Sequence, residues 1–345
     1  MFGEIHLPKE LSAIELDKYL ENGWFRMGQS IFTCNFLNFN RQFYSAIWLR
    51  HVLKDFYVDN TFKKLKKLNS KFRIEFSEAK VTEDKELLFQ KYKMGISFEN
   101  ASSLNMLLFD NKEFTIFNTY EICIYDKFEL IAVGFFDIGL HSAEGIVSFY
   151  NPAYKKYSLG KYLIYNKIEY CKSIGLSYFY PGYFAPNYPL FDYKLTISKF
   201  NIEFYNLFSR KWQSINSFDI NNTPLTEMKS KLDIMLKCLH SNGFIAVLLN
   251  YEYYNSNNIP HLAGYDLFDY PIFIMILNPT FDNFAPIIVW DTLEQKYSIV
   301  KCVSSFFAKD YISDGKYYGT HLMKIQECLF SHVDESLLIQ NVFAT

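Results

Sequence analysis

A short turn of small and basic residues, followed by a run of tyrosines, is the part of the chain best suited to chemistry. The turn is Ser158-Leu159-Gly160-Lys161, and the tyrosines are Tyr178, Tyr180 and Tyr183. If the turn opens a helix, the first N–H groups of that helix have no partner within it and attract an anion. We therefore expect an anion site at this turn, with a wall of aromatic rings beside it.

The pattern around the turn predicts the elements that position it. Apolar residues recur at helical spacing over residues 159–174. The polar positions between them are Lys161, Lys167, Glu169 and Lys172. Ser158 is a suitable N-cap and Gly175 a suitable left-handed stop. β-Branched and aromatic runs at 145–150 and 176–180 predict a buried strand on each side of the helix.

A β-hairpin is predicted upstream of this unit. Residues 120–125 and 129–137 are alternating or continuous apolar runs, and Asp126-Lys127 between them forms a turn. The predicted order is therefore antiparallel strands, then a crossover helix, then a further strand.

Four motifs in this region share one order with a known family. They are Ser158-Leu159-Gly160-Lys161-Tyr162, the helix with Ile168-Glu169, the aromatic strand that ends at Tyr183, and Tyr193-Lys194. Together they resemble the C-terminal catalytic half of the aminoacyl-tRNA–protein transferases, which include eukaryotic arginyltransferases and bacterial leucyltransferases acting on N-terminal Asp and Glu. The resemblance implies an α+β chain with a GNAT-like acyltransferase fold, in which a crossover helix joins strands of a mixed sheet.

The N-terminal part departs from the family at its cysteines. Gly23-Trp24-Phe25-Arg26-Met27-Gly28 resembles the family's N-terminal segment, after which the family has a cysteine cluster that holds a metal or an iron–sulfur centre. Only Cys34 is present here. Since one thiolate cannot complete a tetrahedral site, we expect no metal, and we expect Phe, Leu and Trp side chains to fill the space.

A second departure removes a carboxylate. The Phe-Asp-Pro that precedes the turn in the family is Tyr150-Asn151-Pro152 in this chain. If that carboxylate acts in the reaction, the chain is impaired or uses another group, and Glu169 is our candidate.

A basic stretch before residue 75 is the predicted RNA contact. Its cations are Lys63, Lys64, Lys66, Lys67, Lys71 and Arg73. Lys66-Lys67-Leu68-Asn69 resembles a basic family stretch that ends in Asn, which implies a surface for the acceptor arm of a tRNA. The alternative is an ordinary solvated helix face.

The reaction implied by the resemblance needs little covalent chemistry. An aminoacyl ester is already activated, so the enzyme must hold a neutral amine against the ester carbonyl and stabilise the oxyanion. We assign catalytic positions to Ser158, Gly160, Lys161, Glu169 and Tyr180. No cofactor is expected beyond the co-substrate, aminoacyl-tRNA.

The substrate-binding residues follow from the same resemblance. Tyr178 and Tyr183, with Tyr180, are expected to stack the terminal adenine and line the aminoacyl pocket. An acidic N-terminal residue on the acceptor protein needs a cation. Lys194, which follows Tyr193 in the best-matched pair, or Arg50 is the candidate.

Composition sets the outer limits. The chain has 345 residues, half of them hydrophobic, and a net charge of −2, so it is not a disordered protein and has no global attraction for nucleic acid. The six cysteines form no C-x-x-C pair, and neither G-x-S-x-G nor H-E-x-x-H occurs. No apolar run is long enough for a membrane helix. We expect a cytoplasmic protein with no DNA or membrane partner.

The chain is long enough for more than one domain. We expect an N-terminal transferase region at 1–75, a catalytic domain at 76–213 and a small α+β domain of unknown role at 214–345. The last begins with a helix capped by Thr223-Pro224, and residues 286–290 and 297–302 suggest a hairpin.

Two other functions remain open. The chain could be a binding module that has kept the fold and lost catalysis, since the cysteine cluster and one carboxylate are missing. It could also be an acyl-CoA N-acyltransferase, although Gly160 alone does not make the Gly-rich loop that holds a CoA pyrophosphate. The donor amino acid (Arg or Leu), the acceptor and the oligomeric state are not determined by the sequence.

Overall fold

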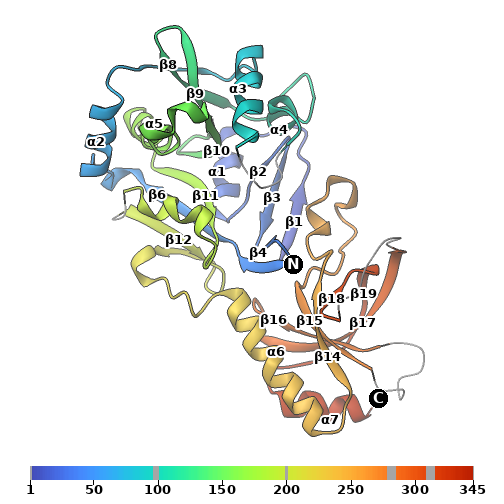
Figure 1. Cartoon of the computed structure of the whole chain (residues 1–345). Coiled ribbons are helices and arrows are strands. Elements are labelled where there is room, and N and C mark those ends of the chain that lie inside the picture. The colour runs from blue at the N-terminus through green and yellow to red at the C-terminus, as the bar shows by residue number, and fades with distance from the viewer. Residues whose placement is uncertain (1, 96–100, 199–200, 278–284, 308–314, 345) are drawn as a thin grey trace.

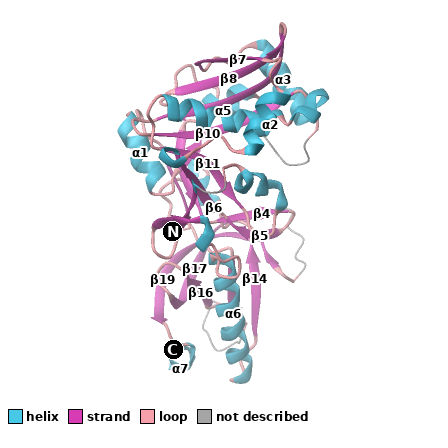
Figure 2. Ribbon diagram, turned by 90° about the vertical axis from the view of Figure 1, so that its left-hand side faces the viewer, coloured by secondary structure: helices cyan, strands magenta, loops and turns pink. Residues whose placement is uncertain are grey.

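The computed structural model describes residues 2–95, 101–198, 201–277, 285–307 and 315–344 (Figure 1). It has a mixed α+β architecture in which two large sheets lie one beyond the other along the molecule (Figure 2). No helix among the described residues is long and apolar enough to cross a membrane.

The larger sheet has eight strands. In spatial order they are β13 (Lys211–Ser214), β12 (Ile202–Asn206), β6 (Ile47–Val52), β11 (Tyr178–Phe184), β10 (Ser142–Tyr150), β9 (Glu129–Ile138), β8 (Thr119–Asp126) and β7 (Arg73–Glu78). Neighbours are antiparallel except β10 and β11, which are parallel. A parallel pair needs a crossover, and α5 (Leu159–Ser173) supplies it. The predicted helix, its two strands and the upstream hairpin are confirmed.

The parallel pair is short. Residues 142–144 of β10 pair with residues 178–180 of β11, and beyond them β10 pairs only with β9 and β11 only with β6. A bulge in β10 lies between Gly145 and Val147, and the register of β11 shifts between Phe179 and Gly182. Bulges bend strands and end pairing, so the two strands diverge toward their carboxyl ends.

The start and the polar face of α5 differ from the prediction. Ser158 precedes the helix in a left-handed conformation (φ 52°), and its side chain makes no capping hydrogen bond. Lys167, predicted among the polar positions, is buried. Its Nζ donates to the carbonyl of Phe135 at 2.8 Å, the carbonyl of Val147 at 3.2 Å and Oγ of Ser148 at 3.0 Å. The predicted stop at Gly175 is confirmed by its φ of 85°.

The N-terminal region forms two small sheets of its own and contributes β6 to the larger sheet. Its elements are β1 (Gly3–His6), α1 (Ala13–Glu21), β2 (Phe25–Met27), β3 (Ser30–Cys34), β4 (Phe36–Phe39), β5 (Gln42–Ser45) and α2 (Asn60–Leu68). Strands β1, β3 and β2 form a small sheet, and β4 and β5 form a hairpin. Because β6 lies between β12 and β11, the predicted boundary at 75/76 does not separate two sheets. Helices α3 (Glu83–Lys93) and α4 (Leu104–Phe109) follow.

The second sheet is built from the C-terminal part. Its spatial order is β18 (Tyr317–Tyr318), β14 (Ala246–Tyr251), β15 (Ile272–Ile276), β16 (Ile287–Asp291), β17 (Lys296–Phe307) and β19 (His321–His332). Helices α6 (Pro224–Ser241) and α7 (Glu335–Ala344) pack on it. The predicted Thr223 cap and the predicted hairpin, here β16–β17, are confirmed.

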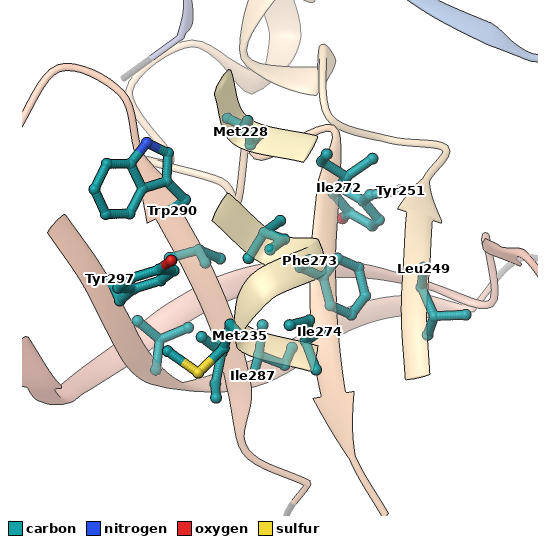
Figure 3. Close-up of a cluster of buried hydrophobic side chains, with 14 of the residues drawn as sticks. Met228, Met235, Leu249, Tyr251, Ile272, Phe273, Ile274, Ile287, Trp290 and Tyr297 are labelled. Atoms are coloured by element: carbon teal, nitrogen blue, oxygen red, sulfur yellow. The ribbon is translucent and has the colours of Figure 1, made fainter. Parts of the chain in front are cut away.

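The core of this C-terminal part also takes in residues from the start of the chain. Met235 of α6 lies beside Ile274 and Ile287 of the sheet, and Met228 belongs to the same buried cluster (Figure 3). The same buried cluster contains Phe2, Phe36 and Phe43. The two ends of the chain therefore share one hydrophobic core, which fixes the β4–β5 hairpin against the C-terminal sheet.

A glycine in the middle of β9 provides a test of the buried lysine. A Cβ at Gly134 would lie 2.6 Å from Cε and 2.9 Å from Nζ of Lys167. We expect Gly134→Ala to lower the free energy of unfolding by about 1–3 kcal/mol, because the lysine cannot keep its three acceptors and avoid the methyl group. Gly95→Ala is the matched control, since a Cβ there meets only ordinary contacts at 3.5 Å and beyond. Denaturant unfolding measures both, and equal stability of the two variants would contradict this account.

Candidate functional site

The start of α5 lies at the protein surface. The 3₁₀ segment Pro152–Tyr157 leads into it, and Ser158 is exposed while Gly160 and Lys161 are partly buried. A Cβ at Gly160 would approach Tyr150 no closer than 3.5 Å. The fold therefore does not require glycine at this position, which leaves close approach of a ligand as a reason for it.

The carboxylate missing at Asn151 has a neighbour that carries one. Asn151 is buried, its Oδ1 accepts from the N–H of Ala153 at 3.1 Å, and its Nδ2 donates to Oε1 of Glu129 at 3.1 Å. An aspartate could not donate to Glu129 and would place two carboxylates side by side. The amide is thus matched to Glu129, which supplies a negative charge just before the α5 start.

The lysine-rich helix α2 lies beside α5 (Figures 1 and 2). Nδ2 of Asn69, at the end of α2, donates to the carbonyl of Tyr157 at 3.1 Å. Lys63, Lys64 and Lys67 are exposed. The predicted basic stretch and the predicted anion site are therefore neighbours, as a nucleic-acid surface that ends at the α5 start requires.

Two of the predicted site residues bind each other instead of a substrate. Nζ of Lys66 donates to Oε1 of Glu169 at 2.6 Å, and both side chains are partly exposed. Glu169 also lies about 12 Å further along the helix axis than Lys161, at 1.5 Å per residue. Glu169 therefore cannot replace a carboxylate at the α5 start.

The predicted tyrosines of β11 lie on the other side of the sheet from α5. Tyr178, Tyr180 and Tyr183 all belong to the cluster around Trp48, whereas Phe179 packs with α5. Tyr180 is only 1% exposed, with edge-on ring contacts to Phe25 and Trp212, and burial raises its pKa to about 12. A buried ring cannot stack a base, so the role predicted for Tyr180 does not fit its position.

Arg50 and Lys194, the two cations predicted to bind an acidic N-terminal residue of the acceptor, both bind other groups of the protein. Nε of Arg50 donates to Oε2 of Glu203 at 2.7 Å, and its guanidinium lies 4.1 Å from the ring centroid of Tyr178. Nζ of Lys194 donates to the carbonyl of Tyr183 at 2.6 Å, and burial lowers the pKa of Lys194 to about 7. Tyr193 beside it is 44% exposed. Lys194 thus holds its 3₁₀ segment, Pro189–Thr196, against β11.

A buried polar cluster where β10 and β11 diverge was not predicted. Nη1 of Arg26 donates to both carboxylate oxygens of Asp137 at 2.9 and 3.0 Å and to Oγ1 of Thr119 at 2.9 Å. The N–H of Arg26 donates to Oε2 of Glu144 at 3.2 Å. Glu144 is paired with Asp137 on one side and with Tyr180 on the other. Only Arg26 had a sequence signal, as part of the segment at 23–28.

The surroundings of Glu144 favour its protonated form. Burial, and then the charge of Asp137, raise its pKa from 4.5 to about 8, while Arg26 opposes the shift. Its Oε1 has no hydrogen-bond partner among the described residues. The guanidinium of Arg26 donates to Asp137, whereas Glu144 receives only the backbone N–H of Arg26 among the described residues, so Glu144 is the carboxyl group that favours a proton.

Cys34 is a core residue. It is buried, its carbonyl accepts from Nε1 of Trp48 at 2.9 Å, and burial raises the pKa of its thiol to about 12. Phe25 stacks on Trp48 with ring centroids 3.7 Å apart. Across the described part of the chain, no three His, Cys, Asp or Glu side chains gather in a way that could hold a metal ion.

The proton on Glu144 makes the stability depend on pH. The folded protein binds a proton that the unfolded chain releases above about 4.5, so this group lowers the stability as pH rises from 4.5 to 8. Glu144→Gln has the shape and charge of the protonated side chain, so its stability should match the wild type near pH 5. Between pH 5 and 7.5 the variant should gain on the wild type by up to about 1.4 kcal/mol per pH unit.

Denaturant unfolding at several pH values measures this difference. Lys167 and Lys194 are present in both proteins, so their titration cancels. Glu294→Gln, at an exposed position, is the matched control and should follow the wild type. Parallel curves for Glu144→Gln and the wild type would show that Glu144 is ionised in the folded protein.

The similarity to known proteins covers the part of the chain that carries the four motifs. Residues 83–203 match the family model described as "Arginine-tRNA-protein transferase, C terminus". The chain is 27% identical over 197 residues to an "Aspartate/glutamate leucyltransferase" of Leptospira interrogans, which covers 54% of this chain and 73% of that protein. A protein of the same name from Helicobacter hepaticus is 26% identical over 194 residues, or 53% and 76% of the two chains.

Solved structures are more distant. L-PGS from Bacillus licheniformis is 12% identical and covers 50% of this chain and 51% of its own, with a TM-score of 0.30, too low to support an argument about the fold. Over the matched region the chain is similar to the aminoacyl-tRNA–protein transferases.

Proposed function

We propose that the protein transfers an aminoacyl group, Leu or Arg, from aminoacyl-tRNA to the N-terminal α-amine of a protein that begins with Asp or Glu. The observation that carries the proposal is the divergence of β10 and β11 after a three-residue parallel pair, with the start of their crossover helix beside a lysine-rich helix. We infer that this arrangement is a GNAT-like acyltransferase fold, in which donor and acceptor meet between the two strands.

The positions of the basic groups support a donor side. The exposed lysines of α2 would contact phosphates of the acceptor arm, and Gly160 and Lys161 would receive a further phosphate of that arm. Gly145 and the three residues after it in β10 are partly exposed although the strand lies inside the sheet. A ligand could therefore reach the backbone of β10 from the side of α5.

The opposite side of the sheet supports an acceptor side. Tyr178 and Tyr183 are partly exposed there, and the buried Glu144 lies where the strands part. The ester is already activated, so positioning of the amine would supply most of the catalysis.

A non-catalytic binding module of the same fold is the second candidate. The burial of Tyr180 and the ion pair of Arg50 with Glu203 favour it, because they remove two groups assigned to substrate binding. A module that recognises only peptide ends would bind no tRNA. An acyl-CoA N-acyltransferase is less well supported, since the α5 start has a single glycine.

A transfer assay tests the proposal directly. Radiolabelled Leu and Arg, each on its cognate tRNA, are offered with peptides that begin with Asp, Glu or, as a control, Ala. We expect label on the Asp and Glu peptides only. Transfer of neither amino acid to any acceptor, by a folded protein that binds the peptides but no tRNA, would favour the binding module.

The lysines of α2 give a second measurement. The triple variant Lys63→Gln/Lys64→Gln/Lys67→Gln should weaken tRNA binding and reduce the slope of log affinity against log salt by up to about 0.9 per lost phosphate contact. Lys9→Gln/Lys18→Gln/Lys112→Gln removes the same charge at exposed positions elsewhere. If both triple variants lower the slope equally, the effect comes from net charge and the assigned RNA surface is wrong.

A further inference from the structure

A pocket of about 410 Å³ lies where the N-terminal and C-terminal parts of the chain meet. Its walls come from the tip of the β4–β5 hairpin, the loop after β11 and the first turns of α6. Neither the hairpin nor α6 falls within residues 83–203, so the family match leaves most of this pocket unassigned.

The pocket is cationic on two walls. Arg41 lines it from the hairpin and Lys229 from α6, and none of the described residues that line it is Asp or Glu. The start of α6 is already satisfied, because Oγ1 of Thr223 accepts from the N–H of Thr226 and Oγ of Ser45 accepts from the N–H of Leu225. The positive potential of the pocket therefore comes from two side chains on separate parts of the chain.

A set of aromatic rings borders the pocket. Tyr44 is one of the lining residues, and Tyr188 follows the lining residue Asn187. The rings of Phe39 and Tyr188 are stacked with centroids 4.5 Å apart, and Tyr44 lies 5.2 Å from Tyr188. All three rings are partly exposed. Cations next to accessible, pre-stacked rings are the groups that bind single-stranded nucleic acid.

The rings also connect the pocket to the diverging strands. Phe191 lies 5.8 Å from both Phe39 and Tyr188, and 5.3 Å from Tyr183 of β11. A chain lying on these rings would therefore lead from the pocket to the strand at which the proposed transfer takes place.

We propose that this pocket binds a nucleotide of the single-stranded 3′ end of the donor RNA, with a phosphate between Arg41 and Lys229 and a base on Tyr44 and Tyr188. The identity of the RNA rests on the proposed function; the pocket itself does not. A peptide acceptor could also use the two cations, but its acidic first residue brings no ring to stack on three adjacent aromatic side chains. The C-terminal part of the chain then contributes Lys229 to substrate binding.

The test uses the full chain and a fluorescently labelled 5′-ACCA-3′ ribonucleotide, which has the C-C-A end common to tRNAs. Anisotropy is measured at several salt concentrations. Arg41→Gln/Lys229→Gln should bind at least tenfold more weakly and reduce the salt slope by about 0.7, the value for one phosphate contact on a single strand. Tyr188→Ala should lose at least about fivefold in affinity with an unchanged slope.

Lys237→Gln is the matched control, because it removes an exposed lysine from the same helix two turns beyond Lys229. It should bind as the wild type does, and thermal melts confirm that each variant is folded. Unchanged binding by the double variant overturns the proposal. So does displacement of the ribonucleotide by an Asp-initial peptide, which would assign the pocket to the acceptor.

The outcome is separable from that of the transfer assay. If the double variant loses the ribonucleotide but the wild type transfers no amino acid, the RNA site stands and the proposed function fails. If transfer is normal in the wild type and the double variant binds the ribonucleotide unchanged, the function stands and this pocket is not part of it.

Discussion

The buried ammonium of Lys167 is the interaction on which the shape of the central sheet depends. It binds the carbonyls of Phe135 in β9 and Val147 in β10, which pair with each other directly after the bulge in β10. Burial lowers the pKa of Lys167 to about 7, so the three hydrogen bonds must offset a large desolvation cost. Because Gly134 has no side chain, it leaves room for the end of the Lys167 side chain.

The divergence fixed by this lysine divides the site between the two faces of the sheet. The α5 start and the lysines of α2 lie on one face, and the tyrosines of β11 lie on the other. A strand normally alternates its side chains between faces, but the register shift after Phe179 returns Tyr183 to the face of Tyr178 and Tyr180. The basic groups and the tyrosines therefore border the opening of the sheet from opposite faces.

Local patterns in the sequence predicted the elements of this site well. The helix at 159–174, its stop at Gly175 and the β8–β9 hairpin follow from periodicity and turn residues, which act over a few positions. The same local patterns did not predict where the side chains lie. A lysine between apolar residues of a helix is normally solvated, and nothing local shows that Lys167 reaches carbonyls of two other strands.

Contacts between distant segments explain the other differences. The insertion of β6 beside β11 depends on hydrogen bonds between residues more than a hundred positions apart, so no local pattern predicts it. Glu144 lies between Ala143 and Gly145 in an otherwise apolar strand, and its partner Arg26 is equally remote. For Lys167 the sequence did carry a signal, which is Gly134. Glycine inside a strand often marks the close approach of another group.

The packing around the β4–β5 hairpin shows how the chain compensates for the cysteines that its family resemblance leads one to expect there. Phe43 meets Tyr254 edge-on at 5.1 Å, and the hydroxyl of Tyr254 donates to the carbonyl of Phe36 at 3.4 Å. Oγ of Ser45 accepts from the first turn of α6. Each of these partners belongs to the C-terminal part. The hairpin is thus held by a second hydrophobic core, and the same contacts place Arg41 opposite Lys229. The contacts that hold the hairpin against the C-terminal part therefore also form the pocket.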